Sequence, residues 1–245
     1  MNKLLFDIQR KIIFYEPQRF PEIISSLIYT SKYNLKRYKT NIEGWLSLPE
    51  VSLLHKIAKS LPNRSKVLEI GCYGGFSTAV ILDALKESNS ILYSIDPFDY
   101  DMDRQKKEID STKNIISKEL GLEYFIYKPS MESVSKLLKS YGFQNFRLIQ
   151  DYSYKVSKKW KHKLDMLWID GNHDYPEVKR DYLDWSPFLK KGGVIVFHDA
   201  NKLNKSNYWH WGLHGPTRVA REYIKKPKWI NINRVDSIVY AKKNQ

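Results

Sequence analysis

Residues 67–78 read Val67-Leu68-Glu69-Ile70-Gly71-Cys72-Tyr73-Gly74-Gly75-Phe76-Ser77-Thr78. The apolar run that ends at Ile70 predicts a buried strand, and a helix is expected to begin near Ser77. Glycines let the backbone between them pass close to a ligand and adopt conformations closed to other residues. The segment therefore predicts a ligand-binding turn, although a plain tight connection from strand to helix also fits it.

Short apolar runs, each followed by a longer helical pattern, recur along the chain. They are Val67–Ile70, Ile91–Ile95, Phe146–Ile149, Met166–Ile169 and Val194–Phe197. This alternation predicts βαβ units, which build a parallel sheet with helices on both faces. Near the end, Trp229–Ile232 and Ser237–Ala241 are strand-like, and their short link permits an antiparallel pair but not a crossover helix. The expected fold class is α/β: a doubly wound, mostly parallel, seven-stranded sheet with an antiparallel terminal strand.

Three segments fall outside this alternation. Residues 1–45 carry apolar side chains at helical spacing and predict a helical N-terminal extension, followed by a helix from Leu48 towards Ser60. Residues 46–245 are then expected to form one domain. Within it, residues from about 100 to 130 are an inserted, charged segment, which is a candidate lid over a substrate pocket. The stretch from Asn201 to Gly215, which carries Trp209, His210, Trp211 and His214, is a second candidate lid.

Composition narrows the class of protein. The chain has 245 residues, of which 42% are hydrophobic, so it can bury a full core as one globular domain. Its single cysteine, Cys72, excludes an internal disulfide framework and a cysteine-rich zinc site, and fits a reducing compartment. The first thirty residues mix charged with apolar positions, so we expect no signal peptide and no transmembrane segment. The expected location is cytoplasmic.

The chain is strongly basic, with 41 Lys and Arg residues against 27 Asp and Glu, a net charge of +14. Two runs contribute most: Lys32 to Lys39 with interleaved tyrosines, and Lys155 to Lys163 around Trp160. A charge of this sign favours nucleic acids, anionic membranes or phosphorylated metabolites. A solvated, lysine-rich surface is the simpler interpretation of both runs.

Polar side chains follow the predicted strands, where an open α/β sheet binds ligands. Asp96 ends the strand after the glycine turn, and a carboxylate there can accept both ribose hydroxyls of a nucleoside. A simple turn at Asp96-Pro97 is the alternative. Asp151 and Ser153 end the next strand and are candidates for holding an adenine, although a plain loop fits them equally well.

Two further strands each deliver a carboxylate, Asp170 and Asp199. On adjacent parallel strands these groups would converge, and two converging carboxylates repel unless a cation or a proton lies between them. Hard divalent ions such as Mg²⁺ take oxygen ligands in this manner.

The glycine turn also fits a known family. Its Glu-x-Gly-x-x-x-Gly spacing resembles the first motif of S-adenosylmethionine methyltransferases rather than the dinucleotide Gly-x-Gly-x-x-Gly turn. From Asn41 to Tyr240, about four-fifths of the chain resembles the bacterial class I methyltransferases grouped with macrocin-type sugar O-methyltransferases. The matching motifs are Ile-Asp-Gly-x-His-x-Tyr from Ile169, Trp185, Gly-Gly-x-Ile-x-x-His-Asp from Gly192, and Gly215-Pro216. The resemblance implies a Rossmann-like fold.

The resemblance also assigns roles by position. S-adenosylmethionine would be held by Glu69, Gly71, Cys72, Tyr73, Gly75, Ser77, Thr78, Asp96, Asp151, Ser153 and Asp170. His173 would be the base, acting with Asp170, and Mg²⁺ would bind Asp170 and Asp199. His198 replaces the first member of the acidic pair that this family carries, so a metal would have fewer carboxylates or a mixed ligand set that includes His198.

These assignments predict a methyltransferase that acts on a small hydroxylated acceptor, such as a sugar or a glycosylated or polysaccharide precursor. His173, with an ordinary pKa of roughly 6.5, could accept the hydroxyl proton. The basic surface keeps open a nucleic-acid or modified-nucleotide methyltransferase, which is less favoured because no added RNA-binding module is recognisable. A same-fold enzyme with another reaction and a non-catalytic cofactor-binding protein are further alternatives. Assembly as a homo-oligomer stays open.

Overall fold

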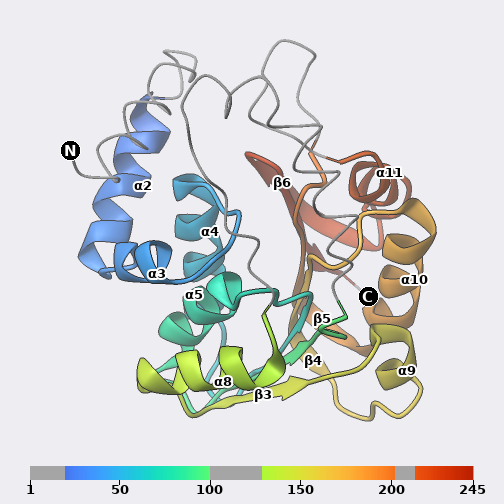
Figure 1. Ribbon diagram of the computed structural model, residues 1–245. Helices are drawn as coiled ribbons and strands as arrows, with labels where there is room; N and C mark the ends of the chain where they lie inside the picture. The colour runs from blue at the N-terminus through green and yellow to red at the C-terminus, as the bar shows by residue number, and fades with distance from the viewer. Residues whose placement is uncertain (1–19, 100–128, 202–212, 245) are drawn as a thin grey trace, which may run out of the picture.

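The computed structural model describes residues 20–99, 129–201 and 213–244, which form a central sheet between two layers of helices (Figure 1). Within these ranges the sheet has seven strands in the order β3-β2-β1-β4-β5-β7-β6. Their bounds are β1 Lys66–Ile70, β2 Ile91–Ile95, β3 Phe146–Ile149, β4 Leu164–Ile169, β5 Leu189–Phe197, β6 Trp229–Val235 and β7 Ile238–Lys243. Strands β1 to β5 pair in parallel, and β7 runs antiparallel to both β5 and β6. The predicted fold class is confirmed.

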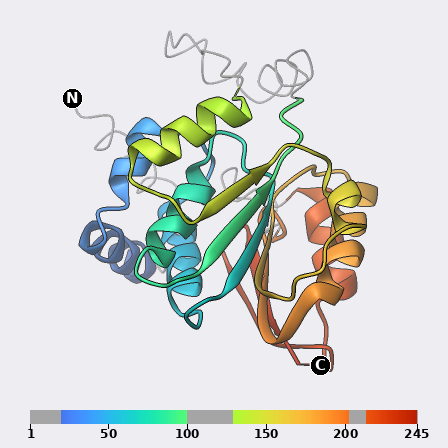
Figure 2. The same ribbon diagram turned by 90° about the horizontal axis from the view of Figure 1, so that it is seen from below.

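Helices cover both faces of the sheet, as the view from below also shows (Figure 2). One side carries α2 (Phe20–Lys32), α3 (Lys36–Asn41), α4 (Leu48–Lys59), α5 (Phe76–Leu85) and α8 (Met131–Ser140). The other carries α9 (Ser153–Ser157), α10 (Tyr175–Trp185) and α11 (His214–Tyr223), with a 3₁₀ turn at Ser186–Phe188. No helix of the described ranges combines the length and apolar character needed to cross a bilayer.

The central strand β4 shows how the sheet builds two cores. All six of its residues are buried, and successive side chains point to opposite faces. Met166 and Trp168 join the core under α4 and α5, while Leu167 and Ile169 join the core under α10 and α11. Each such buried side chain contributes about 1.5–3 kcal/mol relative to exposure. The strand therefore anchors both layers and fixes the position of the residue that follows it.

The strand ends differ from the sequence prediction where polar residues interrupt an apolar run. Strand β5 begins at Leu189 rather than Val194, because Leu189 pairs with Leu164 before an irregularity in the register, after which Val194 pairs with Met166. Strand β4 likewise begins at Leu164. The helix expected near Ser77 begins one residue earlier, at Phe76, after Gly75 as N-cap. Hydrogen bonding along a ladder does not depend on side-chain polarity, so hydropathy alone misses these ends.

Residues 20–41 form α2 and α3, joined by a turn, and α2 packs on α4 while α3 contacts α5. The buried Asp83 of α5 joins these layers. Its Oδ1 accepts a hydrogen bond from Tyr38 Oη (2.8 Å) and its Oδ2 lies 3.0 Å from His55 Nε2. The other ring nitrogen of His55 lies 2.9 Å from Tyr29 Oη, and Arg37 donates to Asp83 Oδ1 at 3.1 Å. One carboxylate thus ties both N-terminal helices to the domain.

Parts of three predicted segments lie outside the described residues. They are residues 1–19 of the N-terminal extension, residues 100–128 of the proposed insertion, and residues 202–212 with Trp209, His210 and Trp211. His214 is described, and it begins α11.

Candidate active site

The glycine turn lies directly against the end of β4. Gly71 adopts a φ of +85°, in the region that favours glycine, and a Cβ added there would come within 2.1 Å of the carbonyl oxygen of Asp170. Gly75, with a φ of +91°, caps α5. The backbone of β1 can therefore pass beside β4 only because position 71 has no side chain.

Asp96, at the end of β2, holds the turn from the other side. Its Oδ2 accepts hydrogen bonds from the backbone amides of Cys72 (2.9 Å) and Tyr73 (3.0 Å), and its Oδ1 accepts from Phe98 N at 2.8 Å. The carboxylate is 3% exposed. The structure thus brings Gly71, Cys72, Tyr73 and Asp96 into one hydrogen-bonded loop.

Glu69 lies beneath this loop and is fully buried. Its carboxylate accepts hydrogen bonds from the hydroxyls of Ser77 (2.6 Å), Thr78 (2.7 Å) and Ser94 (2.6 Å). Ser94 is its direct register partner on β2, which explains that contact. Burial raises the pKa of Glu69 to about 7, against the opposing effect of the three hydroxyls. Glu69, Ser77 and Thr78 therefore bond to one another and support the start of α5.

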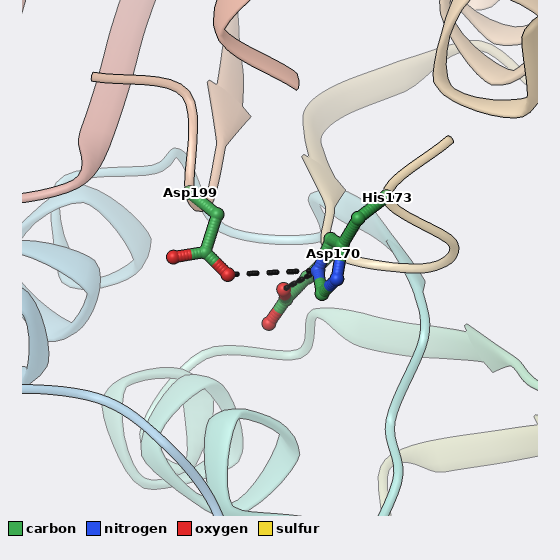
Figure 3. A group of neighbouring side chains, drawn as sticks. All are labelled: Asp170, His173 and Asp199. Carbon is green, nitrogen blue, oxygen red and sulfur yellow. Dashed lines mark ion pairs between the residues drawn. The ribbon is translucent and has the colours of Figure 1, made fainter. Parts of the chain in front are cut away.

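Asp170, His173 and Asp199 form a cluster at the carboxyl edge of the sheet (Figure 3). Asp170 follows β4 and Asp199 lies just past the end of β5, and these strands are neighbours. His173 Nε2 lies 3.5 Å from Asp199 Oδ2 and 4.0 Å from Asp170 Oδ1. The potential ligand atoms of the three residues all lie within 4.8 Å of one another. Parallel strand ends thus bring together the two carboxylates that the sequence predicted to converge.

His198 lies behind this cluster and is 5% exposed. Its Nδ1 lies 3.0 Å from Asp170 Oδ1 and 3.4 Å from Asp199 Oδ2, while Nε2 faces Glu50 Oε2 at 3.6 Å. Burial by itself lowers the pKa of His198, but the charges of Asp170 and Asp199 outweigh it and raise that pKa well above its ordinary value. His198 thus lies close to both carboxylates, whereas His173 completes the group of potential metal ligands with them.

The ionisation of the cluster reflects the same charges. Burial tends to raise the pKa of Asp170, but the positive charge of His198 lowers it below the ordinary value. For Asp199 burial prevails and its pKa is raised. The pKa of His173 is raised as well, since its interactions with the nearby carboxylates of Asp170 and Asp199 outweigh its burial. Both histidines thus favour the protonated form more than a free imidazole does.

Comparison with known proteins identifies the family. A model of a methyltransferase domain matches residues 68–200, which is more than half of the chain. The chain belongs to this methyltransferase family. The matched range begins in β1 and ends just past Asp199, so it contains the glycine turn, Asp96 and the whole carboxylate cluster.

Solved structures confirm the fold of this methyltransferase. The O-methyltransferase TomG from Streptomyces achromogenes, in complex with S-adenosylmethionine, is 15% identical with a TM-score of 0.54, over 96% of this chain and 93% of that chain. The MycE methyltransferase of the mycinamycin biosynthetic pathway, in complex with Mg, S-adenosylhomocysteine and mycinamycin VI, is 14% identical with a TM-score of 0.52, over 87% of this chain and 54% of that chain. The chain is thus a member of a methyltransferase family and has the class I fold of these enzymes.

One curated relative matches a shorter stretch. It is the uncharacterized protein y4gI of Sinorhizobium fredii, which is 30% identical over 64 residues. This stretch spans 26% of the methyltransferase and only 7% of the relative.

The two residues proposed for adenine lie apart from the cluster. Asp151 follows β3, where its Oδ1 accepts a hydrogen bond from Tyr152 N (2.8 Å) and lies 3.7 Å from Lys155 Nζ. Ser153 donates a short hydrogen bond to Asp181 of α10, and burial raises the pKa of that carboxyl to about 7. Asp151 thus stays half-exposed beside the sheet, whereas Ser153 joins α9 to α10.

Sequence reasoning missed Glu50 and Ser237 of the methyltransferase. Glu50 lies in the first turn of α4 and is 4% exposed, and Ser237 lies in the turn between β6 and β7. The Ser47-Leu48-Pro49-Glu50 pattern was available as a capping-box signal, and the box is present. It indicates a helix start, whereas the contact of Glu50 with His198 depends on tertiary structure.

The aromatic residue of the second basic run is partly buried and packs against the core. Trp160 packs edge-on against Tyr93 (4.9 Å between ring centroids) and Trp185 (5.3 Å). Its neighbours Lys159 and Lys161 are exposed and, with Arg147, line an open pocket beside β3. This run precedes β4, whereas Asp170 follows it, so the basic pocket and the cluster are separate features of the methyltransferase.

Proposed function

We propose that this methyltransferase transfers a methyl group from S-adenosylmethionine to a hydroxyl oxygen of a small acceptor, such as a sugar or a glycosylated precursor. The observation that carries the proposal is the convergence of the Asp170, His173 and Asp199 side chains beside the glycine turn. TomG is an O-methyltransferase and MycE was solved with mycinamycin VI, which supports an oxygen acceptor in a small molecule.

The donor would lie against the glycine turn. A Cβ at Gly71 has no room beside the Asp170 backbone, so the glycine turn lies directly next to the cluster. Asp96 would accept the ribose hydroxyls while it holds the amides of Cys72 and Tyr73. Glu69 would act indirectly by fixing Ser77 and Thr78 at the start of α5. S-adenosylmethionine supplies an electrophilic methyl group on a sulfonium.

The cluster would handle the acceptor proton. The bond from the methyl carbon to sulfur breaks as its bond to the acceptor oxygen forms, and the hydroxyl proton passes to His173. Asp170 and Asp199 flank His173 and orient its ring. Their charges raise the pKa of His173, which makes its neutral form a stronger proton acceptor. Most of the rate would come from holding donor and acceptor in line.

The same side chains fit a divalent cation such as Mg²⁺. Asp170 and Asp199 offer the carboxylate oxygens that this ion prefers, and His173 offers one nitrogen within the same 4.8 Å group. A bound divalent ion lowers the pKa of a coordinated hydroxyl and orients it. Since His198, whose pKa is raised, lies 3.0 Å from Asp170 Oδ1, we expect a weaker requirement for metal than an all-carboxylate set would impose.

Calorimetric titration with S-adenosylmethionine tests the donor assignment. We expect binding to the wild type, and binding weaker by about 10- to 100-fold in Asp96→Asn, since hydrogen bonds to a charged group are worth about 1.5–3 kcal/mol. Repeating the titration with Mg²⁺ separates use of the metal from use of the donor. Absence of binding at millimolar donor would contradict the proposal.

Methyl transfer from labelled donor to a panel of hydroxylated compounds tests the acceptor class. Sugars and glycosylated compounds should accept label, and mixed RNA should not. A nucleic-acid substrate is the competing hypothesis, because Arg147, Lys159 and Lys161 have no ion-pair partner within the described ranges. RNA binding that falls steeply with salt concentration would favour that hypothesis.

A further inference from the structure

Glu50 is a buried carboxylate that belongs to neither the glycine turn nor the cluster. Its Oε2 accepts a hydrogen bond from Ser47 N (2.8 Å), and its Oε1 accepts from Ser237 N (2.9 Å) and Ser237 Oγ (2.6 Å). Helix α4 thereby meets the turn between β6 and β7 across 187 positions of sequence. Such a set of bonds holds the carboxylate in one orientation.

The Oε2 atom of Glu50 also faces His198, and the His198 ring lies between Glu50 and Asp170 of the active site. Oε2 of Glu50 lies 3.6 Å from Nε2 of His198, and Nδ1 on the opposite side of that ring lies 3.0 Å from Asp170 Oδ1. Within the described part of the chain, Nε2 of His198 makes no hydrogen bond, so Glu50 is the charged group that faces it. The ring also packs against Trp168, with 5.6 Å between centroids.

A second path leads from Glu50 to Asp199. Ser237 Oγ donates to Glu50 Oε1 and accepts a hydrogen bond from Asp199 N at 3.2 Å. Asp199 has a φ of +51°, an uncommon conformation for a residue with a side chain, so its backbone needs external support. Glu50 is therefore linked to both acids of the cluster. The His198 imidazole connects it to Asp170, and the Ser237 hydroxyl connects it to Asp199.

We propose that Glu50 is a positioning residue, which holds the His198 ring and the Asp199 backbone so that Asp170 and Asp199 face His173. This inference rests on the proposed function for its catalytic meaning. Glu50 touches neither donor nor acceptor in this scheme. Partners of this kind, one layer behind the reacting groups, typically change activity by about 10- to 100-fold when they are mutated.

The test compares Glu50→Gln with the wild type. Glutamine keeps the size of the side chain, but one oxygen becomes an NH₂ group that cannot accept the bonds from Ser47 or Ser237. We expect kcat to fall by about 10- to 100-fold, with the KM for donor and its Kd changed by less than about twofold, because the glycine turn is untouched. In a crystal structure of the variant, the 3.0 Å approach of His198 Nδ1 to Asp170 should be lost.

Two control variants separate positioning from stability. Asp83→Asn removes another buried carboxylate that faces a histidine, His55, far from the cluster, and should lower stability while kcat stays within about twofold. Ser47→Ala weakens the cap of α4 but keeps the backbone amide that bonds Glu50, so the His198 geometry should persist. A loss of kcat in all three variants, in proportion to their lost stability, would overturn the positioning role.

Ser237→Ala keeps the proposal testable if Glu50→Gln does not fold. It removes the hydroxyl link and leaves the backbone bond from Ser237 N, so a smaller fall in kcat with unchanged donor Kd is expected. Wild-type kcat and a wild-type His198 and Asp199 geometry in a folded variant would overturn the proposal. If the wild type transfers no methyl group, the proposed function fails, yet the crystal structures of the variants still decide whether Glu50 positions His198.

Discussion

Two regions of this methyltransferase place carboxylates close to a histidine, and they differ in how far these side chains are exposed to solvent. The Asp83 pair joins Asp83 to His55, and both side chains are 0% exposed. The active-site cluster joins Asp170 and Asp199 to His173, with exposed side-chain fractions of 20%, 21% and 44%. The first pair faces only protein, whereas the second faces solvent.

Hydrogen bonding explains the contrast. One oxygen of Asp83 accepts hydrogen bonds from Tyr38 and Arg37, and the other oxygen lies 3.0 Å from the His55 ring nitrogen. The carboxylate therefore faces protein groups and not a ligand. Burial alone would raise the pKa of Asp83, but the bonds from His55 and Tyr38 lower it to about 2. Burial instead prevails at Asp199, whose pKa is raised. A carboxylate whose oxygens are all occupied by protein groups, as in Asp83, stabilises the fold. A carboxylate that faces solvent, as in Asp170 and Asp199, keeps lone pairs for a substrate or an ion.

The largest expected effect is on catalysis, from Asp170→Asn. The amide cannot carry the negative charge that orients His173 and His198, so methyl transfer should slow by about 10²- to 10⁴-fold. The rate with labelled donor and an identified acceptor checks this. Wild-type turnover in the variant would show that Asp170 has no part in the mechanism. The contrast between the solvent-facing cluster and the Asp83 pair would then have no functional meaning.

Asp83→Asn should instead lower the stability of the fold and leave methyl transfer nearly unchanged. Removing the charge leaves buried His55 and Tyr38 with poorer partners, which should cost about 3 kcal/mol in the free energy of unfolding. Urea denaturation of both proteins measures this cost. A stable variant with impaired donor binding would show that the Asp83 pair serves the active site, contrary to the contrast drawn above.

The pH dependence sharpens the same point. Because folding lowers the pKa of Asp83 from 3.8 to about 2, its stabilisation is present above pH 3.8 and is lost as the pH falls through about 2. The difference in unfolding free energy between wild type and Asp83→Asn should therefore shrink between about pH 4 and pH 2. A difference that stays constant down to pH 2 would mean that the carboxylate charge does not hold this pair.

The smallest expected effect comes from Arg37→Ala. The Arg37 side chain is 40% exposed, so its ion pair with Asp83 is weakened by water and salt. We expect a loss of about 0.5 kcal/mol that diminishes at high salt concentration. Arg147→Ala, which removes an exposed cation outside any ion pair of the described residues, is the control and should leave stability unchanged. A loss above about 2 kcal/mol for Arg37→Ala would place Arg37 among the buried partners of Asp83.

Sequence alone predicted the parts of the site that depend on local pattern. The apolar run into Gly71, and the carboxylates after β2, β4 and β5, followed from strand spacing and from the rule that parallel strands end at one edge. The family resemblance added His173, whose Nε2 lies 3.5 Å from Asp199 Oδ2. Ser153 shows the limit, because its position after β3 suggested a ligand while its hydroxyl bonds Asp181.

The sequence by itself determined the order of strands and helices, the glycine turn and the acids that end the strands, because each depends on residues close together in the chain. Only the tertiary structure decided which carboxylate is surrounded by protein groups, as Asp83 is, and which faces solvent, as Asp170 does. It also decided that Glu50 faces His198. These contacts join residues that are tens to nearly two hundred positions apart, and no local periodicity encodes which of many polar side chains will share one buried space.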